Sequence, residues 1–236
     1  MGKKRRRRSS MSWIRLYLTV EGETELKFAK ETLASHLARF EVEVRPRMVL
    51  TNRKLGKRGG ALHFQRFKRD TTHLMKDDAN REARFSTMMD LYALPADHPG
   101  WAKAEKKSKP ADRVLELEKA LASELADSRF IPFLQLHEFE ALLYCDLSQI
   151  QSRIEDSEKA VAQLQQEVAH LNPEDINEGE TTAPSKRLIK YLPRYEHLKV
   201  RVGAPAASAI GLPALRVKCP HFGQWLARME KLKETL

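Results

Sequence analysis

Residues 14–40, IRLYLTVEGETELKFAKETLASHLARF, decide the fold. The first part has a period of two, typical of a strand, with apolar side chains at Ile14, Leu16, Leu18 and Val20. The second part has the spacing of an amphipathic helix, with apolar side chains at Leu26, Ala29, Leu33, Leu37 and Phe40. A second strand pattern follows at 42–50 and is shortened by Pro46. Strand, helix and strand in this order favour a parallel sheet.

The alternation continues through residue 145. Strand patterns occupy 85–91 and 130–136, and the second is apolar almost throughout, as expected of a buried parallel strand. Helix patterns lie around Phe67 and Leu74, at 114–125 and from 141 onward. Beyond residue 146 the patterns are helical, at 150–171, 185–192, 204–211 and 222–232, with a polar loop at 172–184. We therefore expect a Rossmann-like α/β core at 12–145 with a mostly parallel sheet, and a helical annex at 146–236 packed on it.

Composition excludes several classes of protein. The chain of 236 residues is 42% hydrophobic and 31% charged, which is typical of a globular protein with a full core. No apolar run approaches the roughly 20 residues of a membrane helix, so no membrane partner is expected. Cys145 and Cys219 are too few for a disulfide framework or a four-thiolate zinc site. We expect a cytoplasmic protein.

The positive charge is concentrated in an N-terminal tail. The formal net charge is +10, and the lysines and arginines at 3–8 supply more than half of it. We expect residues 1–11 to be a disordered basic tail. Met11 is itself a candidate start, so this tail is either an extension outside the native protein or an arm that binds phosphates without sequence preference. The smaller excess in the rest of the chain is a mild indication of a polyanionic partner.

Three predicted strands end in carboxylates, at Glu21, Asp90 and Glu138. The carboxyl ends of parallel strands form one rim, where ligands bind, so we expect these three side chains to converge. Clustered carboxylates repel one another unless a hard divalent cation neutralises them. The pattern predicts a Mg²⁺ or Mn²⁺ site for phosphodiester chemistry.

Each acid also has a structural interpretation, as a residue of a helix start or a turn. Their shared position at strand ends favours the functional one. Glu140 lies two residues beyond Glu138, so only one of the pair need point inward, and we favour Glu138 as the metal ligand. His137 is either a base or phosphate contact or a histidine satisfied at the strand end.

Basic segments are candidates for binding a nucleic-acid backbone. One loop, rich in glycine, carries Arg53, Lys54, Lys57 and Arg58. Lys186 and Arg187 follow a turn at a predicted helix start, where they either contact a phosphate or form a solvated basic turn. A turn-rich stretch at 95–110 holds Trp101 and lysines at 103, 106, 107 and 109. No phosphate-binding loop of the Walker A type occurs, so ATP hydrolysis would belong to a partner.

The stretch LYLTVEGETELKF at 16–28 resembles the opening strand, glutamate and helix of a TOPRIM domain, the fold of topoisomerases, primases and OLD nucleases. The resemblance implies that Glu21 is the family's glutamate. The family's Asp-x-Asp motif corresponds to Asp90 and Tyr92, so the second aspartate is replaced. Glu138 or Glu140 would then be its substitute.

A narrower resemblance covers the chain from Met11 onward. It is to a bacterial family of TOPRIM-like proteins of unassigned function, discussed as defence-island partners of AAA or ABC-type ATPases. The matching segments are VEGETE at 20–25, MMDLYALP at 88–95, LHEFEALLY at 136–144, APSKRL at 183–188 and LRVKCPHFGQWL at 215–226.

Two functions remain in competition. The first is a Mg²⁺-dependent endonuclease for DNA or RNA, including tRNA, acting as an antiphage effector controlled by a partner ATPase, with Glu21, Asp90, Glu138 and Glu140 as catalytic residues. The second is a degenerate TOPRIM-like module that docks on an ATPase or nucleic acid without cutting, which Tyr92 favours. A homo-oligomer is compatible with either function.

Overall fold

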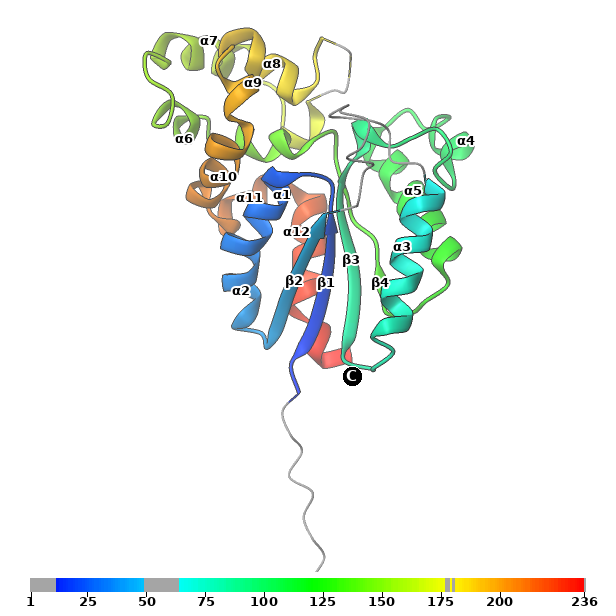
Figure 1. Ribbon diagram of the computed structural model, residues 1–236. Helices are drawn as coiled ribbons and strands as arrows, with labels where there is room; N and C mark the ends of the chain where they lie inside the picture. Colours follow the sequence, from blue (N-terminus) through cyan, green and yellow to red (C-terminus); the bar gives the residue numbers. More distant parts are fainter. Residues whose placement is uncertain (1–11, 49–63, 177–178, 180, 236) are drawn as a thin grey trace, which may run out of the picture.

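The computed structural model describes residues 12–48, 64–176, 179 and 181–235. Figure 1 shows a sheet flanked by helices, with further helices beyond the carboxyl ends of its strands. The strands are β1 (Ile14–Val20), β2 (Val42–Met48), β3 (Ala83–Asp90), β4 (Phe130–Ile131) and β5 (Leu134–Gln135). Their order is β2-β1-β3-β4, β5 also pairs with β3, and every recorded pair is parallel. The predicted α/β fold with a mostly parallel sheet is confirmed.

The opening strand and helix follow the predicted pattern. All four alternate apolar residues of β1, from Ile14 to Val20, are fully buried on one face. The helix runs through α1 (Glu23–Phe28), the π-helical η1 (Ala29–Leu33) and α2 (Ala34–Ala38). Its first turn is fixed by Glu25, whose carboxylate accepts a hydrogen bond from Gly22 N at 3.1 Å.

The predicted strand at 130–136 is broken into β4 and β5. Pro132 lies between them and has no N–H to donate to the ladder, which explains the interruption. The Thr87 hydroxyl of β3 fills the gap, because it donates to Phe133 O at 2.8 Å and accepts from Phe133 N at 2.9 Å. The backbone pairing lost at this point is thus replaced by a side chain.

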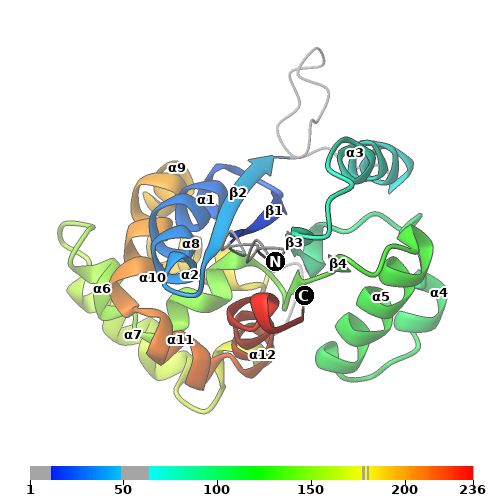
Figure 2. The same ribbon diagram turned by 90° about the horizontal axis from the view of Figure 1, so that it is seen from below.

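Helices lie on both faces of the sheet (Figure 2), and an apolar cluster is buried under the helices of each face. One face is covered by α3 (Phe64–Asp77), α4 (Trp101–Ala104) and α5 (Pro110–Leu125), with Phe85 of β3 among its buried residues. The other is covered by α1 and α2 together with C-terminal helices, so that Leu18 of β1 and Trp225 belong to the same cluster. The C-terminal part therefore completes the core of the sheet.

Beyond residue 146 the described chain is helical, as predicted. Its elements are α6 (Ser148–Gln151), α7 (Glu158–Val168), η5 (Pro173–Asp175), α8 (Pro184–Tyr191), α9 (Tyr195–Leu198), η6 (Lys199–Gly203), α10 (Ala204–Ile210), α11 (Leu212–Lys218), α12 (Pro220–Glu230) and η7 (Leu232–Thr235). Two short 3₁₀ helices precede this part, η3 (Leu91–Ala93) after β3 and η4 (Phe139–Cys145) after β5. In the part of the chain that the structure describes, no helix is long and apolar enough to cross a membrane.

The single helix predicted at 150–171 is wrong, since α6 and α7 are separate. Asp156 has a positive φ of 57°, which interrupts the helical conformation between them. The buried Ser157 hydroxyl donates to the carbonyl oxygens of Gln151 and Ile154. Asp and Ser compete with helical hydrogen bonding in this way, and the apolar spacing does not reveal it.

Near the amino end of the sheet, Asp78 holds a dense polar network. Its carboxylate accepts from Arg15 Nε at 2.7 Å, Arg15 Nη2 at 2.9 Å and the Tyr17 hydroxyl at 3.0 Å. Asn80 adds an amide donor at 2.8 Å. These hydrogen bonds, with Arg15 the main contributor, hold the pKa of Asp78 well below its ordinary value.

Candidate active site

Glu21 and Asp90 meet at the carboxyl end of the sheet. The backbone N–H of Asp90 donates to Glu21 Oε2 at 3.1 Å. Glu21 N in turn donates to Met88 O at 3.3 Å, so the exits of β1 and β3 are joined. The parallel pairing of these two strands puts both acids at one rim, as the sequence predicts. The Glu21 side chain is exposed and Asp90 is half-buried, which leaves this side of the site open.

Glu138 and Glu140 enter the same site from the third strand exit. His137 adopts a left-handed conformation with φ 63°, which turns the chain out of the strand. The 3₁₀ helix η4 begins directly after Glu138, and both glutamates are buried. Only one of the pair needed to point inward, and the structure brings both into the site. Phe139 N donates to Asp90 Oδ1 at 2.9 Å and ties this segment to β3.

The N-terminus of α8 holds Glu138 in place. Ser185 donates twice to this carboxylate, from its backbone N at 2.7 Å and from its hydroxyl at 2.9 Å. Pro184 begins the helix, where its missing N–H leaves no donor unsatisfied. A carboxylate at a helix N-terminus is stabilised by the free N–H groups and by the helix dipole. The C-terminal third thus supplies part of the site.

Three further residues of the site were missed by the sequence analysis. Glu25 lies one helical turn after Glu21, and its buried carboxyl interacts with those of Glu21 and Glu140. Lys199 forms an ion pair with Glu140 at 3.0 Å, and the buried Tyr195 hydroxyl donates to the same carboxylate at 3.4 Å. The four-residue spacing within VEGETE is the one signal that indicates Glu25.

Burial and mutual repulsion raise the pKa values of Glu25, Asp90 and Glu138. Burial is the main cause for Glu25, whose pKa rises to about 7, with Glu140 and Glu21 adding to it. Burial followed by repulsion from Glu21 raises the pKa of Asp90 well above its ordinary value, and burial also raises the pKa of Glu138. Burial opposes the charge of Lys199, yet its ion pair with Glu140 gives it a raised pKa. The protein thus concentrates more negative charge here than its own groups neutralise.

The donor chemistry of the cluster fits a hard divalent cation. Carboxylate oxygens are the ligands that Mg²⁺ prefers, and a bound cation would relieve the repulsion that raises these pKa values. Within the described residues, no three His, Cys, Asp or Glu side chains stand as a ready set of ligands. The carboxylates face protein donors instead, such as Ser185 for Glu138. Binding would require some of them to turn toward the cation.

The lysines and arginines predicted to contact a nucleic-acid backbone do not share one environment. Arg53, Lys54, Lys57 and Arg58 lie outside the described residues. Lys186 is exposed beside Ser185 at the start of α8. Arg187 is half-buried, where it pairs with Glu167 and donates from Nε to Thr182 O at 2.8 Å. These contacts hold Arg187 against its own protein, and a phosphate contact by Lys186 or Arg187 stays a prediction.

The sequence left the roles of some residues undecided, and the structure places these residues in different environments. His137 is fully buried and contacts Glu174 O through Nε2 at 3.1 Å, which favours a satisfied histidine over a base. Tyr92 has an exposed fraction of 43% and lies two residues beyond Asp90. Cys219 is fully buried with its Sγ 3.4 Å from that of Cys145, in agreement with a packing role.

Comparisons with known proteins identify the family. Residues 20–230 match the family model described as Domain of unknown function (DUF4276). The match covers most of the chain, so the chain belongs to this family. No curated protein and no solved structure gives a significant match.

Proposed function

We propose that this member of the DUF4276 family is a metal-dependent nuclease. The observation that carries the proposal is the carboxylate cluster, in which Glu21, Asp90, Glu138 and Glu140 come from three separate strand exits. Such a concentration of charge weakens the fold, as the raised pKa values of Asp90 and Glu138 indicate. A gain in function is the physical reason to retain it. The resemblance to TOPRIM nucleases around Glu21 and Asp90 supports the same reaction.

Glu21, Asp90 and Glu138 would hold the cation, Mg²⁺ or Mn²⁺, with Glu140 as a further ligand. When bound, the cation activates a water molecule and stabilises the leaving oxygen of the phosphodiester. Lys199, with an exposed fraction of 37%, lies where it would offset the charge of an incoming phosphate. Glu25 is buried behind the cluster and holds the Glu21 turn through Gly22.

A raised pKa gives the cluster a second capacity. At neutral pH a carboxyl with a pKa of about 7, such as that of Glu25, is protonated in part of the molecules. A group of this kind exchanges protons readily near physiological pH, as general acid–base chemistry requires. The open side of the site at Glu21 and Asp90 would admit the substrate backbone.

The alternative is a module that binds without cutting. Tyr92 in place of the second TOPRIM aspartate favours it, because an exposed aromatic ring suits binding better than metal ligation. In this alternative Glu21 would matter less than the basic residues. Control by a partner ATPase, and a role in antiphage defence, belong to the proposal on the strength of the resemblance alone.

Cleavage assays with matched variants test the proposal. The full chain is incubated with single-stranded and duplex DNA and RNA in Mg²⁺, Mn²⁺ or EDTA. We expect cleavage in the presence of either metal, and a loss of at least about 100-fold in Glu21→Gln. Glu23→Gln, which changes an exposed acid on the first turn of α1, is the control and should retain activity. Metal-independent cleavage, or full activity of Glu21→Gln, would show that the nuclease assignment is wrong.

A further inference from the structure

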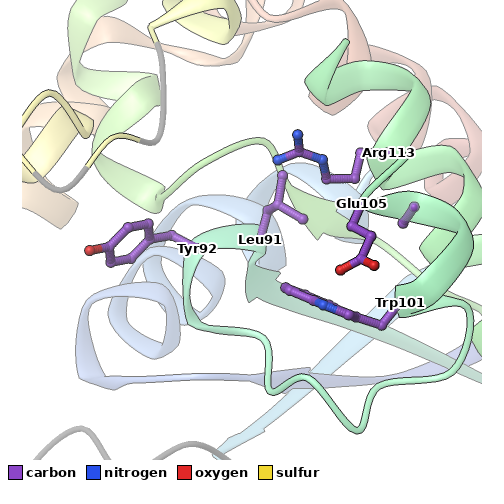
Figure 3. Close-up of a pocket in the computed structure, with 6 residues that line it drawn as sticks. Leu91, Tyr92, Trp101, Glu105 and Arg113 are labelled. Carbon is purple, nitrogen blue, oxygen red and sulfur yellow. The ribbon is translucent and has the colours of Figure 1, made fainter. Parts of the chain in front are cut away.

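A pocket opens beside the acid cluster. It has a volume of about 300 Å³ and is lined by Leu91, Tyr92, Trp101, Ala104, Glu105 and Arg113. Leu91 and Tyr92 follow Asp90 directly, and Tyr92 N donates to His137 O at 3.0 Å, so the pocket adjoins both acid-bearing segments. Figure 3 shows Trp101, Glu105 and Arg113 around one space near Leu91, while Tyr92 extends away from them. We call this site the Trp101 pocket.

The wall of the Trp101 pocket is a rigid part of the fold. Trp101 begins α4, which packs on α5. Gly100 makes this close packing possible, since its φ is 82° and a Cβ there would lie 2.6 Å from Ala120 Cβ. The indole is partly buried and packs against the apolar cluster of this face. Its orientation is therefore fixed before any ligand arrives.

The lining is suited to a flat, heteroaromatic ring. A Trp face and an Arg guanidinium plane are surfaces on which nucleobases stack. The Glu105 carboxylate, at the same space, is an acceptor for an N–H of a base. The volume is at the lower end of the range for small-molecule sites, about 300–1,000 Å³, so it suits a single base.

The surroundings favour a ligand with a phosphate backbone. The stretch from Trp101 to α5 carries four exposed lysines, Lys103, Lys106, Lys107 and Lys109. They lie in the same helical hairpin as Trp101, and their positive charge is opposite in sign to that of the acid cluster. Aromatic side chains within a basic segment are the usual composition of a surface that binds single strands.

We propose that the Trp101 pocket binds one unpaired nucleobase of a single-stranded DNA or RNA segment. This inference rests on the proposed nuclease function, since a base held next to Asp90 places the adjoining phosphate at the acid cluster. A base within a duplex is stacked and paired, so it cannot enter the pocket without being flipped out. The pocket therefore selects single-stranded segments as the substrate class.

Binding in EDTA separates this inference from cleavage. The probe is a fluorescently labelled oligonucleotide of mixed sequence, used as single-stranded DNA, single-stranded RNA and the matching duplex. Trp101→Ala is expected to weaken binding of a single strand by about 5- to 100-fold, because stacking on one aromatic contributes that much per base. Trp101→Phe keeps a stacking surface and should remain within about 3-fold of the parent. Duplex binding should be weaker and insensitive to either change.

Trp13→Ala is the matched control. Trp13 is 45% exposed just before β1, at the other end of the sheet, and its removal should leave binding unchanged. Thermal unfolding of each variant verifies that it folds. Unchanged binding by a folded Trp101→Ala, equal binding of duplex, or no binding of any single strand by the parent would overturn the inference. If Trp101→Ala binds and cuts like the parent, this inference fails while the proposed nuclease function stands.

Discussion

Two aspartates at opposite ends of the sheet show how the same side chain serves different purposes. Asp78, near the amino end, is surrounded by donors, and Arg15 above all lowers its pKa. Asp90, at the carboxyl end, is surrounded by other carboxylates, and burial with their repulsion raises its pKa. The first environment favours the charged form and stabilises the fold. The second opposes the charged form and becomes favourable when a positively charged ligand enters.

The difference separates a structural end of the sheet from a functional one. Most acids of the structural end are matched by cations, as Asp127 is by Arg129 at 2.7 Å. At the functional end, five acids gather, namely Glu21, Glu25, Asp90, Glu138 and Glu140, and Lys199 interacts with several of them. Excess charge of one sign inside a well-packed protein is therefore a better indication of a site than any single residue of the cluster.

Removing Asp78 should have the largest effect on stability. We expect Asp78→Ala to lower the free energy of unfolding by about 4 kcal/mol, because it leaves the partly buried Arg15 without its carboxylate. Chemical denaturation measures this change. Asp77→Ala, which removes an exposed neighbour on α3, should cost less than about 0.5 kcal/mol. Cleavage per folded molecule should be unchanged in both variants, and a loss of activity in folded Asp78→Ala would break the comparison.

The pH dependence of stability should reveal the functional end. Glu25 has a pKa of about 7 in the fold against 4.5 when unfolded, so the folded state binds its proton more tightly. Its contribution to stability is fully present below pH 4.5 and is lost as the pH rises through about 7. Glu25→Gln keeps an acceptor for Gly22 N and removes this titration. Its stability relative to the parent should therefore rise by about 3 kcal/mol between pH 4.5 and 8.

Denaturation curves of the two proteins at several pH values test this expectation. The pKa values of His98 and His137 are lowered by burial and act with the opposite sign in the same range, but both proteins contain them. The difference between the proteins therefore isolates the Glu25 cluster. Glu23→Gln, on the exposed side of α1, should show no such trend. A difference between parent and Glu25→Gln that is independent of pH would contradict the assignment.

Lys199 should have the smallest effect of the three. We expect Lys199→Met to lower stability by about 1 kcal/mol at pH 8, since it removes a partly exposed partner of Glu140. The loss should shrink at pH 5, where fewer of the neighbouring carboxyls are charged. Thermal unfolding at the two pH values measures it, with Lys30→Met on the exposed side of η1 as the control. Greater stability of Lys199→Met at pH 8 would mean that the cluster is not short of positive charge.

The sequence predicts those parts of the fold that depend on local periodicity. The alternation from Ile14 to Val20 and the helical spacing from Leu26 onward correspond to β1 and the helix after it. The convergence of Glu21 and Asp90 follows from a general rule about parallel sheets, so it needs no knowledge of side-chain contacts. Periodicity also indicates the helical character of the C-terminal part.

What the sequence did not predict depends on single residues or on long-range contacts. Pro132 divides the strand at 130–136, and Asp156 with Ser157 divides the helix at 150–171, although apolar spacing continues across both. The turn at His137 and the 3₁₀ helix that follows it bury both Glu138 and Glu140, although only one of the pair needed to point inward. Lys199 and Ser185 reach the acids from more than 40 residues away, and no local pattern encodes such contacts.

The double hydrogen bond from Ser185 to Glu138 has a consequence for a chain that is still being synthesised. A ribosome-bound chain that has emerged only as far as η4 already carries all the acids of the cluster. The groups that hold Glu138 and Glu140, on α8, α9 and η6, emerge later. Trp225 and the rest of α12, which complete the core beneath β1, emerge later still. A partly made chain therefore has the ingredients of the site without its assembled form, and the order of synthesis delays whatever chemistry the site performs until these helices have been made.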